Sequence, residues 1–225
     1  MSLTYVIADL HGRADLLDEA LLRIAAHASA RGMNSGGTIV TLGDYVSKGP
    51  DSRGVVERLS ANPPGGFTLI ALKGNHDAMM VGALRDGSGM PEWLGKGGAT
   101  TLASYGGDIS SVPPAHLAWL DARPLLHEDA HRLYVHAGVD PALPLYAQNE
   151  RTLLWKRYPK AEEGGYGARH VVHGHDNQVD GPLLFAGHSN LDTAAWRTGR
   201  LVIGIFDDDT PGGPVDFITV QGAAA

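Results

Sequence analysis

The chain has 225 residues, of which 43% are hydrophobic and 19% charged, with a formal net charge of −7 and no cysteine. This length and composition predict a single α/β domain, residues 1–225, with a substantial core. The negative charge argues against broad electrostatic binding to nucleic acid or to a membrane surface. The lack of cysteine excludes disulfides and thiolate metal sites.

The chain has no apolar run near the ~20 residues that a membrane-spanning helix needs. Its first residues carry no basic segment and lead directly into an apolar stretch, so we expect no signal peptide. Together with the absence of cysteine, these features predict a cytoplasmic protein without membrane partners.

The first ~80 residues alternate short apolar runs with longer segments of helical periodicity. Short apolar runs predict buried strands, and apolar residues three and four positions apart predict helices. The order strand–helix–strand–helix–strand is typical of a parallel sheet with covering helices. The predicted elements are strands at Thr4–Asp9, Thr38–Gly43 and Phe67–Leu72, helices at Ala14–Ala30 and Asp51–Ser60, and a turn at Asn62–Gly66.

The rest of the chain is less regular. Residues 87–107 are glycine-rich, and we expect them to be irregular. Other predicted elements are helices at His76–Leu84, Pro113–Leu120 and Arg151–Arg157, and strands at Arg132–His136, His170–His173, Leu183–Ala186, Arg200–Phe206 and Pro214–Val220. The expected fold is a central mixed β-sandwich flanked by helices. The first strands form one sheet, and the antiparallel C-terminal third forms much of the other.

Polar side chains that can bind metals follow five of these apolar runs. The ends of parallel strands meet at one sheet edge, so the clusters can converge, and two metals could share Asp44 as a bridge. Without cysteine the ligands must be His, carboxylate and amide oxygen, which suit Mn, Fe or Zn. The clusters are Asp9-Leu-His11, Asp44, Asn75-His76-Asp77, His136 and His173-Gly-His175.

Each cluster alone has a simpler explanation. An Asp-x-His pair is common in any sequence, the segment Gly74–Asp77 fits a turn with a helix N-cap, and His136 fits a hydrogen-bonded core histidine. The presence of all five, each at the end of a strand, favours a shared metal site.

These motifs resemble those of the calcineurin-like metallophosphoesterase family. Within it they resemble the branch of bacterial serine/threonine phosphoprotein phosphatases and symmetrical diadenosine tetraphosphatases. The resemblance spans most of the chain and implies the four-layer metallophosphoesterase fold. The matching segments are Asp9-Leu-His11, Gly43-Asp-Tyr-Val-Ser-Lys-Gly49, Gly74-Asn-His-Asp77, 93–106, His136-Ala-Gly138, 154–157 and Gly174-His175.

The resemblance implies an enzyme that hydrolyses phosphoesters with two divalent metal ions, manganese foremost, with iron or zinc as alternatives. A hydroxide between the metals would attack phosphorus in line. The implied ligands are Asp9, His11 and Asp44 for the first metal, and Asp44, Asn75, His136 and His175 for the second.

The resemblance also implies roles for three further side chains. His76 would protonate the leaving oxygen or stabilise the transition state. Arg157 would clamp phosphate oxygens with its planar guanidinium. Lys48 stands where the family has an Arg that grips phosphate, and a lysine is not an equivalent replacement, because it offers a point charge on a flexible stem.

The sequence departs from the family pattern at other positions near the implied site. Ser47 replaces the Asp that orients the catalytic His, so the pKa of His76 should be lower than in relatives unless Asp77 compensates. Lys96 replaces an Asn, and it is either a phosphate-binding residue or a solvated loop lysine. Ala194 stands where relatives have a Gly.

The substrate is left open by the sequence. A phosphoprotein, a symmetrical dinucleoside polyphosphate, or a phosphorylated partner that a metal-binding pseudophosphatase holds without turnover would each fit. We expect residues 87–107 and 141–167 to form the walls of the cleft and to set specificity. For His173 we favour a supporting role in its strand over one as a metal ligand.

Overall fold

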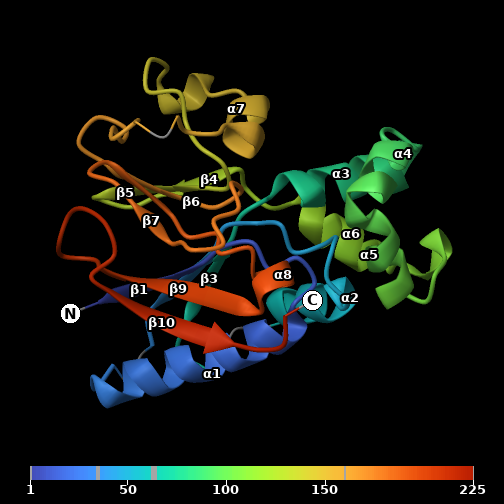
Figure 1. Ribbon diagram of the computed structural model, residues 1–225, viewed down its shortest axis with the longest axis horizontal. Helices are drawn as coiled ribbons and strands as arrows, with labels where there is room; N and C mark the ends of the chain where they lie inside the picture. The colour runs from blue at the N-terminus through green and yellow to red at the C-terminus, as the bar shows by residue number, and fades with distance from the viewer. Residues whose placement is uncertain (1, 34–35, 62–64, 160, 225) are drawn as a thin grey trace.

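Two five-stranded mixed sheets face each other in the computed structural model, which describes residues 2–33, 36–61, 65–159 and 161–224 (Figure 1). The first sheet has the order β10–β9–β1–β2–β3. Its strands are β1 Leu3–Ile7, β2 Thr38–Thr41, β3 Thr68–Ala71, β9 Arg200–Asp207 and β10 Asp216–Gln221. The strands β1, β2 and β3 are parallel, and β9 and β10 are added antiparallel.

The second sheet has the order β4–β5–β6–β8–β7. Its strands are β4 Leu126–Glu128, β5 Arg132–Val135, β6 His170–His173, β7 Leu183–Leu184 and β8 His188–Asn190. The three central strands β5, β6 and β8 are parallel, and each edge strand is antiparallel to its neighbour. The predicted mixed sandwich flanked by helices is confirmed.

The helices lie around this sandwich. In Figure 1, α1 runs along the outer face of the first sheet, α3 to α6 gather at one end, and α7 lies beyond the second sheet. None of the described helices has the length and apolar character needed to cross a bilayer. The helices are α1 Ala14–Ala30, α2 Ser52–Ser60, α3 Asn75–Asp86, α4 Met90–Trp93, η1 Leu94–Gly98, α5 Ala99–Ser104, η2 Ile109–Ser111, α6 Pro114–Asp121, η3 Leu145–Ala147, α7 Glu150–Trp155 and α8 Ala195–Thr198.

The strand β1 is apolar apart from Thr4, and all five of its residues are buried. Successive side chains of a strand point to opposite faces. Tyr5 and Ile7 pack in the cluster that includes α1, while Val6 packs in the cluster between the two sheets with Val172 and Phe206. Because both faces of the strand are covered, no polar alternation is possible.

Two expectations differ from the structure. The last two strands extend the first sheet instead of the second, because β9 pairs with β1 from Leu3↔Asp207 to Ile7↔Ile203. The glycine-rich segment 87–107 contains α4, η1 and α5, since Trp93 and Tyr105 are buried and anchor it. The predicted turn at Asn62–Gly66 falls largely outside the described residues.

Candidate active site

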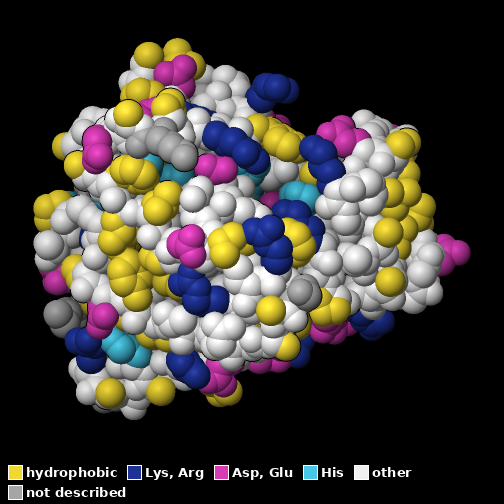
Figure 2. All heavy atoms as spheres, in the orientation of Figure 1, with side chains coloured by type: hydrophobic (Ala, Val, Ile, Leu, Met, Phe, Trp, Pro, Cys, Tyr) yellow, Lys and Arg dark blue, Asp and Glu magenta, His cyan; other side chains and the backbone are white. Residues whose placement is uncertain are grey.

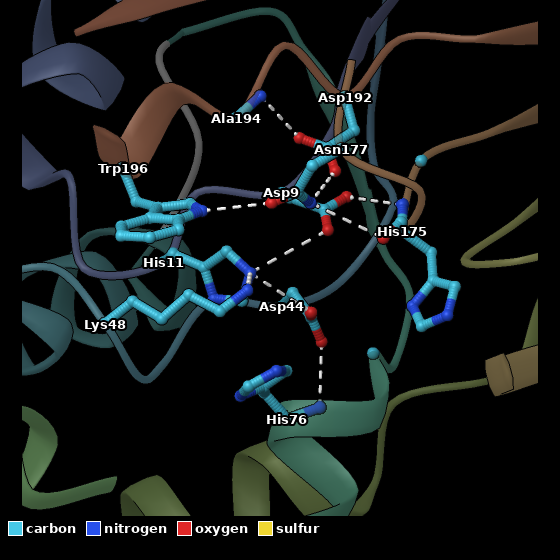
Figure 3. A network of polar contacts seen from close by, with 12 residues as sticks. Asp9, His11, Asp44, Lys48, His76, His175, Asn177, Asp192, Ala194 and Trp196 are labelled. Atoms are coloured by element: carbon cyan, nitrogen blue, oxygen red, sulfur yellow. Dashed lines mark hydrogen bonds and ion pairs between the residues drawn. The ribbon is translucent and has the colours of Figure 1, made fainter. Parts of the chain in front are cut away.

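Loops that follow strands of both sheets bring the six predicted ligands together. Parallel strands of one sheet end at the same edge, so β1, β2 and β3 deliver their following loops side by side, and β5 and β6 add theirs from the second sheet. Figure 3 shows part of the resulting cluster. Its members are Asp9, His11, Asp44, Asn75, His136 and His175, of which the first five are at most 2% exposed.

Asp44 lies at the centre of this cluster. One carboxylate oxygen, Oδ2, lies 3.4 Å from His11 Nε2, and the other, Oδ1, lies 3.6 Å from His136 Nε2. Two groups of possible metal ligands, one with His11 and His76 and one with Asp9 and His136, both include Asp44. The geometry therefore allows Asp44 to serve two cations at once.

Hydrogen bonds to backbone carbonyls fix how two of the histidines present their nitrogens. His11 Nδ1 lies 2.9 Å from Val46 O, and His136 Nδ1 lies 2.9 Å from Leu42 O. A carbonyl only accepts, so each Nδ1 carries the hydrogen, and each Nε2 turns a lone pair toward the cluster. This is the tautomer that a histidine needs in order to bind a metal through Nε2.

Acceptors face one another at the centre of the cluster. Asn75 Oδ1 lies 2.8 Å from His136 Nε2 and 3.1 Å from His175 Nδ1. Asp9 Oδ2 is buried without a hydrogen-bond partner among the described residues. Buried acceptors without donors are costly, and a cation satisfies them. The donor set therefore fits divalent metal ions.

Burial shifts the pKa values of these groups strongly. It raises the pKa of Asp9 to about 8, with Asp44 as a further cause, and that of Asp44 to about 7. It lowers the pKa of His136 and of His175 to about 3. A proton on a histidine is thus disfavoured at neutral pH, and a nearby divalent charge would favour the ionised carboxylates.

The backbone is also strained at this site. Six non-glycine residues among those described have a φ in the left-handed region, and five of them lie here: His11, Asp44, Ser47, Lys48 and His175. Such conformations cost free energy and persist only where the surroundings enforce them. The loops are therefore shaped to aim these side chains.

Asp77 holds two of these loops together. Its carboxylate accepts hydrogen bonds from the backbone N–H groups of Asp44 (2.8 Å), Tyr45 (2.9 Å) and Gly74 (2.9 Å). All of these bonds lead to backbone, so the hypothesis that Asp77 replaces the missing orienting acid of His76 is not supported. Asp77 instead fixes the loop that carries Asp44 to the start of α3.

His76 lies beside the cluster, with its ring edge-to-face against His11 at a centroid separation of 4.8 Å. Its Nδ1 and the hydroxyl of Ser47 are both buried without hydrogen-bond partners among the described residues. Burial, and then the charge of Lys48, lower the pKa of His76 to about 2. The imidazole is therefore neutral at physiological pH.

Three cations surround a pocket of about 300 Å³ above the cluster. Lys48 Nζ lies 2.8 Å from His11 Nε2. Arg157 is 68% exposed, and its guanidinium lies 3.4 Å from the carboxylate of Asp176. Lys96 is the third cation, and His76 lines the same pocket. Figure 2 shows this region as a hollow bordered by Lys and Arg side chains.

His173 makes its contacts on another side. Its Nε2 lies 3.0 Å from His188 Nδ1, and its ring lies 4.7 Å from that of Tyr158. Both nitrogens have partners outside the ligand cluster, since Nδ1 lies 3.1 Å from Gly174 O. This supports the interpretation of His173 as a supporting residue of its strand.

The sequence analysis did not identify Asp192 as a residue of the site. Its buried carboxylate accepts hydrogen bonds from the Asn177 amide and from Ala194 N at 2.8 Å (Figure 3). Burial, and then Asp9, raise its pKa. Asp192 thereby ties the loop after His175 to the segment between β8 and α8. Asp192 lies two residues before Ala194, a position that the sequence analysis compares with the family. That comparison was the signal from which Asp192 could have been identified.

The chain belongs to the calcineurin-like phosphoesterase family, because residues 3–190 match the Metallophos profile of that family. It is accordingly a metal-dependent phosphoester hydrolase.

Among its relatives, serine/threonine-protein phosphatase 2 of Escherichia coli (strain K12) is 26% identical over 208 residues, which cover 88% of this chain and 89% of that protein. The symmetrical bis(5'-nucleosyl)-tetraphosphatase of Paracidovorax citrulli (strain AAC00-1) is 34% identical over 146 residues, 61% of this chain. The chain spans only 45% of the length of that tetraphosphatase. A crystal structure assigned as a diadenosine tetraphosphatase superposes with a TM-score of 0.66 at 26% identity, covering 99% of this chain and 94% of that one.

Proposed function

We propose that this enzyme hydrolyses phosphomonoesters of serine and threonine in proteins. The reaction takes place at a centre of two manganese ions, and the chain forms a single catalytic domain. The observation that carries the proposal is the convergence of buried lone pairs on both sides of the Asp44 carboxylate. The proposed ligands are Asp9, His11 and Asp44 for one metal, and Asp44, Asn75, His136 and His175 for the other. Their oxygen and imidazole donors suit manganese, with iron and zinc as alternatives.

When bound, two divalent cations lower the pKa of a water molecule to give a nucleophile and neutralise the phosphoryl oxygens. The chain positions the substrate for this chemistry. Lys48 and Arg157 hold phosphoryl oxygens at the pocket, and Arg157 exchanges its Asp176 partner for phosphate. His76 then faces the leaving oxygen.

The role of His76 follows from its protonation state. With a pKa near 2, its imidazole is neutral and carries one N–H. A neutral imidazole donates a hydrogen bond to the developing negative charge on the leaving oxygen. This favours stabilisation of the transition state over full proton transfer, the other role considered for His76.

The phosphoprotein substrate is supported by the extent of the similarities. Among the two sequence relatives, the Escherichia coli phosphatase aligns over nearly the whole length of both chains, while the Paracidovorax citrulli tetraphosphatase aligns over less than half of its own. The structure assigned as a diadenosine tetraphosphatase, which is covered to 94%, keeps the nucleotide as a second candidate. A cysteine-free composition with negative net charge also supports a cytoplasmic enzyme without nucleic-acid partners.

One observation favours a symmetrical dinucleoside polyphosphate as a second candidate substrate. A neighbouring pocket of about 370 Å³ shares Asp176 with the catalytic pocket and is lined by aromatic rings of Tyr158, Phe185 and His188. Aromatic walls beside a phosphate site suit a nucleobase.

A substrate panel tests both candidates. The manganese-loaded enzyme should hydrolyse phosphoserine and phosphothreonine peptides with a higher kcat/KM than diadenosine tetraphosphate. The opposite order would favour the nucleotide. No turnover of any phosphoester with any divalent metal, combined with tight phosphopeptide binding, would instead indicate a pseudophosphatase.

A further inference from the structure

Lys96 and Trp155 meet across the mouth of the catalytic pocket. The ammonium of Lys96 lies 4.7 Å from the centre of the Trp155 ring. Lys96 belongs to η1, which directly follows α4, and Trp155 ends α7. In Figure 1, α4 and α7 lie in different parts of the molecule. Both side chains line the pocket that contains Lys48 and His76. Lys96 is 41% and Trp155 37% exposed, so the contact lies where the pocket meets solvent.

The position of Lys96 is fixed by the catalytic loop. Lys48 N donates a hydrogen bond to Gly97 O at 3.2 Å, and Ser47 N donates one to the Thr101 hydroxyl at 2.8 Å. Gly97 has φ +99°, and a Cβ there would lie 2.6 Å from Lys48 N, so only glycine allows this approach. Lys96 is thus not a lysine of a free loop, since its backbone is docked on the segment that carries Lys48.

The partners that Lys96 has in this structure are weak ones. Besides the Trp155 ring, its ammonium contacts the Glu92 carboxylate at 3.0 Å, and that pair is exposed, with Lys96 at 41% and Glu92 at 61%. Exposed ion pairs and cation–π contacts contribute little in water. A phosphate dianion offers a stronger, charge-assisted bond to the same ammonium.

The Ser47–Lys48 segment also explains why a further cation is needed. An arginine at position 48 would present a planar fork with several donors, whereas a lysine presents a single charge. Phosphoryl oxygens that an arginine would hold are therefore left for another donor at the pocket.

We propose that Lys96 is a phosphate-binding residue that selects dianionic phosphomonoesters, and that its contact with Trp155 is its resting position. On substrate binding the ammonium leaves the ring and pairs with a phosphoryl oxygen. The inference rests on the proposed function of the same site. A monoanionic phosphodiester has less charge for Lys96 to hold, so it depends less on this residue.

Steady-state kinetics on the manganese-loaded enzyme test this, with an aryl phosphate monoester and a bis-aryl phosphodiester as substrates. Lys96→Gln should raise KM for the monoester about tenfold and KM for the diester less than about threefold, with kcat nearly unchanged. Lys96→Arg keeps the positive charge, so its KM for the monoester should stay near the wild-type value. Lys73→Gln, which removes a lysine paired with Asp121 away from the pocket, should change neither value.

A fluorescence titration with inorganic phosphate gives a second readout that needs no turnover. Phosphate should change the tryptophan emission of the wild type, and Trp155→Phe or Lys96→Gln should remove that change. An unchanged monoester KM in Lys96→Gln, or an Arg variant as impaired as the Gln variant, overturns the inference while wild-type turnover leaves the proposed function standing. If the wild type hydrolyses no phosphoester, the proposed function fails, and the phosphate titration still decides the role of Lys96.

Discussion

The two sides of the catalytic pocket are built differently. The floor consists of buried side chains whose loops are fixed by backbone hydrogen bonds, such as those that Asp77 accepts from Asp44 and Gly74. The mouth consists of exposed cations, and Lys96 and Arg157 each contact only weak or exposed partners. A floor held in this way tolerates little change, whereas the mouth can change its residues without loss of the fold. The departures from the family pattern spare the proposed ligands. Lys48 and Lys96 lie at the pocket, whereas Ser47 is buried beside Lys48.

Asp44→Asn should have the largest effect, because it weakens the carboxylate proposed to serve both metals. We expect kcat/KM to fall by at least ~10³-fold while the circular dichroism spectrum stays native. Asp51→Asn is the matched control, because Asp51 caps α2 through Gly54 N and Asn caps a helix equally well. Comparable activity of the Asp44 and Asp51 variants would contradict the proposed role of the floor.

Ser47→Asp should sharpen the comparison by adding a charge at a buried position, where the family pattern has Asp. Ser47 has φ +73°, a conformation that Asp adopts more readily than most residues. A carboxylate there should raise the pKa of His76 and increase kcat about tenfold, most clearly when combined with Lys48→Arg. The pH–rate profile measures the pKa change. Ser47→Asn has nearly the same shape without the charge, so an equal gain from it would refute the electrostatic explanation.

Metal binding should become more stabilising as the pH rises. The pKa of Asp9 is about 8 and that of Asp44 about 7, against 3.8 for an ordinary Asp. Without metal the folded chain keeps protons on these groups that the unfolded chain has lost, so its stability falls as pH rises from about 4 to 8. A divalent cation binds the ionised carboxylates instead. Melting curves with EDTA and with Mn²⁺ should therefore show a larger gain in Tm at pH 8 than at pH 5.5, and an equal gain would count against these ligands.

Ala194→Gly should have the smallest effect. Ala194 has φ +52°, and the Gly that relatives carry at this position would relieve that strain. The greater flexibility of Gly in the unfolded chain offsets part of the gain, which leaves about 0.5 kcal/mol, or a rise in Tm of ~1–2 °C. Ala195→Gly, at the right-handed start of α8, should lower Tm instead. A lower Tm in both variants would show that the strain is not relieved.

Much of the floor could be predicted from the sequence. Apolar runs that stop at polar residues give the strand ends, and the parallel order of β1, β2 and β3 brings those ends together. The assignment of β9 could not be predicted, because its apolar residues would suit either sheet and only its pairing with β1 decides.

The function of individual side chains was less predictable where partners come from distant segments. Asp77 looked like a neighbour of His76, but its partners are backbone groups of another loop. The contact between Lys96 and Trp155 joins two segments that no local pattern connects. The sequence thus predicted which residues gather at the site better than what each of them contacts.

The number of metal ions bound per chain tests the central claim most directly. After equilibration with Mn²⁺ and removal of free metal, elemental analysis should find about two ions per wild-type chain and fewer than one per Asp44→Asn chain, with two retained in Asp51→Asn. A wild-type chain that holds no more than one ion, or an Asp44→Asn chain that still holds two, would contradict a two-metal centre built around Asp44.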